Sequence, residues 1–78
     1  MSTLADLSVG DCAQVANITG EDGIAIRLME MGLTPGTEFS LIGKAPLGDP
    51  LELEVRGYRL SVRKSEAARV QLETTRAA

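Results

Sequence analysis

The residues of this chain that could take part in chemistry are few, and most of them are carboxylates. Glu52 and Glu54 alternate along one predicted strand, and Asp49 lies shortly before them. Carboxylate oxygens can bind divalent metal ions. The chain has no histidine and only one cysteine, Cys12, whereas transition-metal sites usually combine several such ligands. We therefore interpret Glu52 and Glu54 as a solvated strand face and predict no dedicated metal site.

The same set of residue types argues against an active site. Histidine is the usual general base near neutral pH, and the chain has none. The phosphate-binding pattern GxxxxGK[ST] is also missing from the sequence, so we expect no nucleotide to be bound in that way. Cys12 alone makes no site, and we expect it to be a small buried apolar residue. We predict no catalytic residue, no cofactor and no enzymatic activity.

Size and charge narrow the remaining classes of protein. With 78 residues the chain fits one domain, and we take 1–78 as a single unit with 74–78 as a frayed tail. The net charge is −3, and the sequence contains one Phe, one Tyr and no Trp. An acidic chain with so few aromatic side chains is poorly suited to nucleic acid phosphates and bases. We therefore predict no nucleic acid partner.

Targeting signals and cysteine usage indicate the compartment. The N-terminus has neither the basic region nor the apolar run of a signal peptide. No apolar stretch approaches the roughly 20 residues that span a bilayer. A single cysteine cannot form an internal disulfide, which suits a reducing compartment. We predict a cytoplasmic protein without direct membrane insertion.

One amphipathic helix is predicted over residues 21–32. Ile24, Leu28 and Met31 recur at positions i, i+4 and i+7, which is the spacing of one helix face. We expect this face to pack against the core. Gly32 can adopt the left-handed conformation that commonly ends a helix.

The rest of this helix is also rich in apolar residues. Ala25, Ile26 and Met29 fall off the predicted core face, so we expect part of the helix surface to be apolar and exposed. Methionine is common at adaptable binding surfaces. We take Arg27, Leu28 and Met29 as candidate contacts with a protein partner, although Met29 or Ile26 could instead pack beneath the N-terminal segment.

A β-hairpin is predicted around the loop Arg56–Gly57. Two-residue loops join antiparallel strands directly, and this loop defines one register for both strands. The register pairs Val55 with Tyr58, Leu53 with Leu60, Leu51 with Val62, and Glu54 with Arg59. Apolar residues then share one face and charged residues the other, so a slip by one residue would disrupt both faces.

Further strands are predicted over residues 12–18, 37–45 and 69–73, with a short helical turn in "RKSEAAR" before the last strand. We predict a mainly β, SH3-like barrel of five strands. It has one short helix between strands 1 and 2 and a one-turn helix before the last strand. An OB-fold is the main rival, but its helix usually lies between the third and fourth strands.

The loop "APLGDP", Ala45 to Pro50, is the second candidate contact surface. Prolines restrict the residues before them to extended geometry and stiffen the loop, so it loses less entropy on binding. Leu47 lies at the tip with no strand to bury it, although it could instead fold back over the open end of the barrel. The predicted contact residues of this loop are Pro46, Leu47, Gly48, Asp49 and Pro50.

Two long motifs resemble a known family. "RLMEMGLTPGTEF", from Arg27 to Phe39, and "APLGDPLELEVRGYRLSVRKSEA", from Ala45 to Ala67, look like FeoA, a family of small cytosolic proteins of bacterial ferrous iron uptake. The leading "LADLSVGD" also fits, so the resemblance covers about Leu4 to Leu72. The chain departs from the usual pattern at Met31 and Val62, where the family has leucine.

The resemblance implies an SH3-like domain that binds the cytosolic side of FeoB, a GTP-dependent Fe²⁺ permease of the membrane, and modulates it. Two other functions stay open. One is direct binding or delivery of Fe²⁺. The other is a repressor-like interaction module, because a similar SH3-like domain ends some metal-dependent repressors. Exposed strand edges could also join identical chains into a homo-oligomer.

Overall fold

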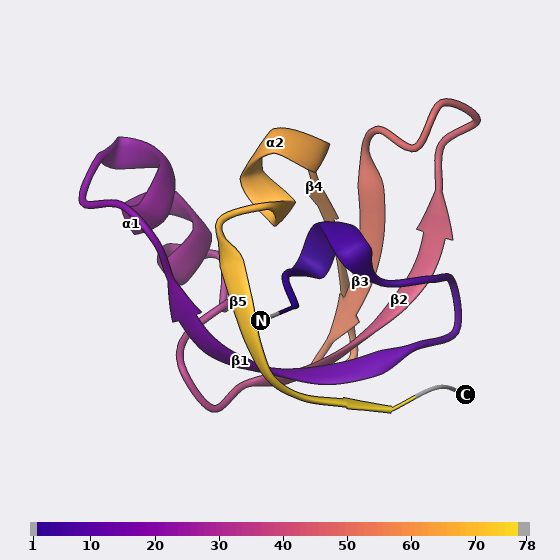
Figure 1. Cartoon of the computed structure of the whole chain (residues 1–78), viewed down its shortest axis with the longest axis horizontal. Coiled ribbons are helices and arrows are strands. Elements are labelled where there is room, and N and C mark those ends of the chain that lie inside the picture. Colours follow the sequence, from indigo (N-terminus) through magenta and orange to yellow (C-terminus); the bar gives the residue numbers. More distant parts are fainter. Residues whose placement is uncertain (1, 77–78) are drawn as a thin grey trace.

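The computed structural model describes residues 2–76 and has the predicted mainly β, SH3-like architecture (Figure 1). In chain order the elements are the 3₁₀ helix η1 (Leu4–Asp6), β1 (Cys12–Ile18), α1 (Gly23–Glu30), β2 (Glu38–Lys44), β3 (Leu51–Val55), β4 (Tyr58–Val62), α2 (Lys64–Ala67) and β5 (Val70–Arg76). As predicted, one helix separates the first two strands, and a single helical turn precedes the last.

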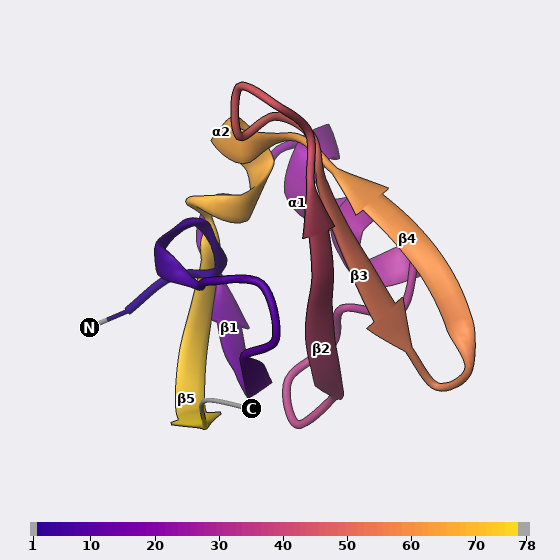
Figure 2. The same cartoon turned by 90° about the vertical axis from the view of Figure 1, so that its right-hand side faces the viewer.

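The five strands form one antiparallel sheet in the order β4-β3-β2-β1-β5. The sheet curves around the core, so that β1 and β5 lie on one side and β3 and β4 on the other (Figure 2). Irregular pairing between Leu41 and Gly43 and on both sides of Val15 accompanies this curvature, because a bulge bends a strand and increases its twist. The sheet does not close, and β4 and β5 remain its edges among the described residues.

The core lies inside this curved sheet. Strand β3 alternates strictly between buried and exposed residues, as expected for a strand with one face against a core. Helix η1 covers one end of the core with Leu4, and Leu7 follows it into the interior. The Asp6 carboxylate accepts a hydrogen bond from the Thr3 backbone N–H at 2.9 Å, which stabilises this short turn.

The predicted hairpin is confirmed in every pair. Strands β3 and β4 align Val55 with Tyr58 and Leu51 with Val62, as the pattern of apolar residues required. Arg56 has φ 50° and Gly57 has φ 87°. Positive φ at both central residues is the mark of a type I′ turn, whose twist matches that of the strands it joins.

The predicted core face of α1 is partly wrong. Ile24 is 39% exposed, whereas Ala25 is 1% exposed and Leu28 is fully buried. Successive helix residues lie about 100° apart, so a helix packed through Ala25 and Leu28 leaves Ile24 and Met29 on either flank. The small side chain of Ala25 lets the helix backbone come close to the core. The spacing of the larger apolar residues, on which the prediction relied, did not reveal this. The prediction of exposed apolar surface on this helix is confirmed by Ile26 and Met29.

Helix α1 ends at Glu30, and Gly32 forms the cap beyond it, as predicted. The Leu33 N–H donates to the Leu28 carbonyl at 3.1 Å, and the Gly32 N–H donates to the Met29 carbonyl at 3.1 Å. These two bonds form a Schellman motif, which requires positive φ at its glycine, and Gly32 has φ 110°. Leu28 and Leu33 are both fully buried, so the motif joins the end of the helix to the core.

The last strand is longer than predicted. Strand β5 continues to Arg76, and Cys12 and Ala13 of β1 pair with Arg76 and Thr75. The expectation of a frayed tail is therefore wrong for residues 74–76, because β1 supplies backbone partners along this length. Residues 77–78 lie outside the described part of the chain.

Within residues 2–76, neither the length nor the apolar character of any helix would allow it to span a bilayer.

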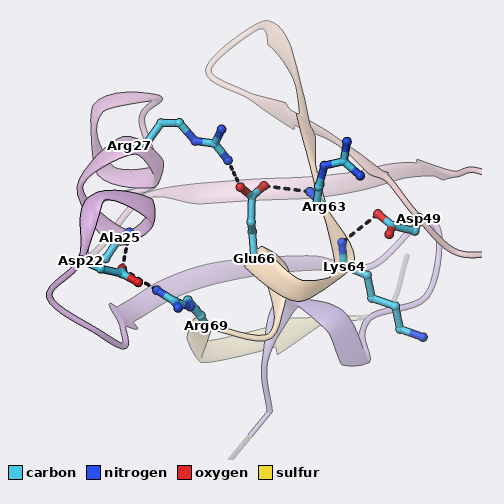
Figure 3. Close-up of polar contacts among 8 residues, drawn as sticks. All are labelled: Asp22, Ala25, Arg27, Asp49, Arg63, Lys64, Glu66 and Arg69. Atoms are coloured by element: carbon cyan, nitrogen blue, oxygen red, sulfur yellow. Dashed lines mark hydrogen bonds and ion pairs between the residues drawn. The ribbon is translucent and has the colours of Figure 1, made fainter.

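Asp22 makes the start of α1 sensitive to acid. Its carboxylate accepts hydrogen bonds from the Ala25 N–H at 3.3 Å and from the Arg69 guanidinium at 2.5 Å (Figure 3). The bond from Arg69, and then that from Ala25, holds the pKa of Asp22 below its ordinary value of 3.8. A carboxylate whose pKa is lowered by folding stabilises the fold above its unfolded pKa and loses this effect as it is protonated.

We expect the stability advantage of the wild type over Asp22→Asn to shrink as pH falls below 3.8. Asparagine still caps the helix but carries no charge, so this pair of proteins isolates the effect of the ionised group. Urea unfolding at a series of pH values between neutral and acidic measures the difference. Parallel stability curves for the two proteins at all pH values would contradict the prediction.

Candidate functional site

The loop between β2 and β3 is a compact turn with an exposed apolar tip. The Gly48 N–H donates to the Ala45 carbonyl at 2.7 Å, and the Ala45 N–H donates to the Pro50 carbonyl at 3.1 Å. Gly48 has φ 80°, a left-handed geometry that glycine adopts without strain. Leu47 is 92% exposed. The alternative in which Leu47 folds back over the barrel is therefore wrong.

Asp49 attaches this loop to the one-turn helix α2. Its carboxylate accepts a hydrogen bond from the Lys64 backbone N–H at 3.0 Å (Figure 3). Lys64 is the first residue of α2, and N–H groups in the first turn of a helix have no partner within the helix. Asp49 thus supplies a missing acceptor, and its role in this structure is to anchor the loop.

Glu66 is the centre of a second polar contact on α2. One carboxylate oxygen accepts a hydrogen bond from the Arg63 backbone N–H at 3.0 Å, and the other is paired with the Arg27 guanidinium from α1. Glu66 is only 7% exposed. A carboxylate so buried needs compensating partners, and both of its oxygens have one here (Figure 3).

Helix α2 therefore connects the two segments that the sequence marked as candidate contacts. A groove of about 300 Å³ lies where they meet. We call it the arginine groove, and it is lined by Arg27, Met31, Pro50, Ser61, Arg63 and Glu66. Arg27 comes from the predicted helix surface and Pro50 from the predicted loop, so the groove joins one residue of each.

The other predicted contact residues have different positions. Pro46 is exposed beside Leu47, and Gly48 is half-buried. Met29 is exposed on α1 but does not line the groove. Leu28 is fully buried, so the interpretation of Leu28 as a direct partner contact is wrong, because its side chain is part of the core that supports the helix.

Sequence reasoning missed Met31, which it assigned to the core, and also Ser61, Arg63 and Glu66 as members of this site. Glu66 stands three residues after the helix cap Arg63, which is the spacing of a capping box, and this signal was visible in the sequence. Its ion pair with Arg27 was not, because the two residues are far apart in the chain and meet only through the fold.

A larger hollow of about 510 Å³ lies elsewhere, over β1, β2 and the β3–β4 turn, with Glu38, Glu54 and Arg56 among its lining. Cys12 also lines it and is half-buried, with its Sγ 3.4 Å from the Ser40 hydroxyl. The expectation that Cys12 is buried thus holds only in part.

Residues 2–76 contain no group of three or more His, Cys, Asp or Glu side chains arranged to hold a metal ion. The arginine groove remains the candidate site because both predicted surfaces reach it.

The open five-stranded sheet, with one helix after β1 and one turn before β5, defines a small SH3-like domain. The FeoA domain family matches residues 2–74. The chain therefore belongs to the FeoA family, as the motifs had indicated.

Relatives with known sequences or structures agree with this assignment. A fusion of Fe(2+) transport protein A with the Fe(2+) transporter FeoB, from Porphyromonas gingivalis, is 31% identical over 70 residues; these are 90% of this chain and 8% of that protein. The FeoA-like protein of Clostridium acetobutylicum is 41% identical, with a TM-score of 0.84 over 91% of this chain and 83% of that one. FeoA of Stenotrophomonas maltophilia, an SH3 domain protein crystallised with zinc, is 32% identical, with a TM-score of 0.85 over 99% and 98%.

Proposed function

We propose that this protein is a non-enzymatic accessory protein of ferrous iron uptake that binds the cytosolic side of a FeoB-type permease and modulates it. The observation that carries the proposal is the fusion in Porphyromonas gingivalis, where a related sequence and the transporter share one chain. Domains joined in one chain act at high effective concentration toward each other, so a separate domain of the same family is a reasonable partner for the separate transporter.

The geometry supports binding as the activity of this domain. Leu47 lies at the tip of a loop that is braced by two backbone hydrogen bonds and by the Asp49 anchor. An ordered loop loses less conformational entropy on binding than a mobile one. A leucine that is 92% exposed in the free domain gains hydrophobic stabilisation when a partner covers it.

We expect Leu47→Asp to weaken binding to the solubilised permease by roughly tenfold or more, because burying a leucine contributes about 1.5–3 kcal/mol and a buried unpaired carboxylate is costly. Met29→Asp on α1 should weaken binding in the same direction if the helix surface also contacts the permease. Binding is measured by co-purification and by surface plasmon resonance with the permease in detergent.

Val9→Asp is the matched control, since Val9 is also an exposed apolar residue and belongs to the turn before β1. In Figures 1 and 2 the segment between η1 and β1 lies away from the loop between β2 and β3. Wild-type affinity in both Leu47→Asp and Met29→Asp would show that this surface is not the interface. No binding of the wild-type protein to the permease in membranes or detergent would refute the proposed function itself.

A further inference from the structure

The arginine groove is positively charged, although the chain as a whole is negatively charged. Three charged residues line it: the two arginines Arg27 and Arg63, and one glutamate, Glu66. Its formal charge is therefore +1, in a chain whose net charge is −3. Among residues 2–76, the Arg63 side chain takes part in no ion pair. The groove thus contains a cation without an internal partner.

Glu66 does not neutralise both arginines. Its two oxygens are occupied by the Arg63 backbone N–H and by Arg27, and Figure 3 shows its carboxylate between the two residues, with the Arg63 guanidinium extending away from it. The Arg27 side chain is still 56% exposed in its ion pair. A guanidinium has five N–H donors, so both arginines keep donors available to a second acceptor.

The free edge of β4 runs along the same region. Tyr58 faces Val55 across the two-residue turn, and such closing pairs exchange backbone hydrogen bonds, after which hydrogen-bonded and non-bonded pairs alternate. Arg59 and Ser61 therefore direct their backbone N–H and C=O groups outward. No other described segment pairs with this edge, and Ser61 itself lines the groove.

We propose that the arginine groove binds an extended acidic segment of a protein partner, which adds to the free edge of β4 and places a carboxylate between Arg27 and Arg63. An extended peptide can satisfy the backbone groups of an exposed strand edge. Arginine binds carboxylates through paired, charge-assisted hydrogen bonds, while Met31 and Pro50 provide apolar walls. The inference deepens the proposed function and rests on it only for the identity of the partner, which is the permease.

Charge complementarity favours an acidic segment at this groove over other sites on the domain. The domain as a whole repels acidic segments, because its net charge is negative, so such a segment is attracted only where the local charge is reversed. Complementary charges chiefly determine where and in which orientation a partner docks. Burial of the carboxylate against Met31 and Pro50 would also reduce the screening of the contact by solvent.

Arg63→Glu tests the proposal directly. We expect it to weaken binding to the permease by roughly tenfold or more, because it replaces an attractive contact by a repulsive one. Arg56→Glu is the matched control: it makes the same change in charge at the hairpin turn, outside the groove, and should change affinity by less than about twofold. Wild-type affinity in Arg63→Glu, with the permease bound normally by the wild type, overturns the inference and leaves the proposed function intact.

A second measurement does not depend on the permease. A synthetic peptide of alternating Glu and Val is titrated into the ¹⁵N-labelled protein, in parallel with the same peptide carrying Gln for Glu and with sodium acetate. The inference predicts shifts of the Arg27, Ser61 and Arg63 resonances with the Glu peptide alone, and their loss in Arg63→Glu. Equal shifts with acetate, or with the Gln peptide, overturn it. If the permease does not bind at all, the proposed function fails, and this titration alone decides the inference.

Discussion

Leu28→Ala is expected to destabilise the protein by about 2–5 kcal/mol, because truncating a buried leucine loses its transfer free energy and leaves a cavity. Leu28 is fully buried on α1. Its carbonyl also accepts the Leu33 N–H that ends the helix. At about 0.05–0.15 kcal/mol per residue, a domain of this size has a total stability of about 4–12 kcal/mol, so this single change removes a large part of it.

Ile26→Ala provides the matched control for this prediction. Ile26 lies two residues earlier on the same helix and is 52% exposed, so truncating it should change stability by less than about 1 kcal/mol. Urea unfolding followed by circular dichroism gives both free energies. Equal losses in the two variants would mean that α1 does not pack against the barrel through Leu28 as described.

Gly32→Ala is the second change with a large expected effect. A residue with a Cβ at φ 110° is strained, and the added methyl group would collide with the Tyr58 hydroxyl. That hydroxyl donates a hydrogen bond of 2.5 Å to the Met31 carbonyl, and it would have to move. We expect a loss of about 2–3 kcal/mol, from left-handed strain of about 1–2 kcal/mol and a hydrogen bond worth about 1 kcal/mol.

Three further variants separate the strain from the collision. Gly48 also has positive φ, but nothing lies within 4 Å of a Cβ built there, so Gly48→Ala should show the cost of strain alone. In a Tyr58→Phe background the hydroxyl is gone, and Gly32→Ala should then cost less than in the wild type. Unfolding free energies of the four proteins in this cycle measure the coupling between the two sites. Strict additivity would contradict a contact between Gly32 and Tyr58.

Helix α2 has a larger role than its single turn suggests. Its first N–H holds the loop through Asp49, and its Glu66 holds α1 through Arg27. The Asp49 contact is a hydrogen bond at the surface, and the Arg27–Glu66 contact is an ion pair between an exposed guanidinium and a buried carboxylate. Together they fix two candidate contact elements to one short helix, so that the loop and α1 reach a partner in a defined relative orientation.

The hairpin was predictable because its information is local. Val55 and Tyr58 are separated by only two residues, and strict alternation of apolar residues around them permits one register. The cap of α1 at Gly32 was predictable for the same reason, because a helix followed by Gly and Leu matches the geometry of one well-defined cap. In both places the residues that decide the structure are neighbours in the chain.

Prediction was weaker where a residue's environment depends on distant elements. Ile24 and Ala25 both fit a helical period with Leu28, and only packing against the curved sheet decided that Ala25 is buried. The extent of β5 was underestimated because Thr74, Thr75 and Arg76 are polar. Backbone pairing with β1, rather than side-chain hydrophobicity, places them in the strand.

The sequence by itself determined the family, the order of the elements and the hairpin register. These follow from residue types at short spacings, where backbone geometry leaves few choices. Only the tertiary structure decided that Leu47 is exposed. It also decided that Arg27 meets Glu66, that Asp49 accepts the first N–H of α2 and that Arg63 borders a groove beside the free edge of β4. Such contacts join segments far apart in the chain, and their geometry exists only once the sheet has curved and brought α1, the loop and α2 together.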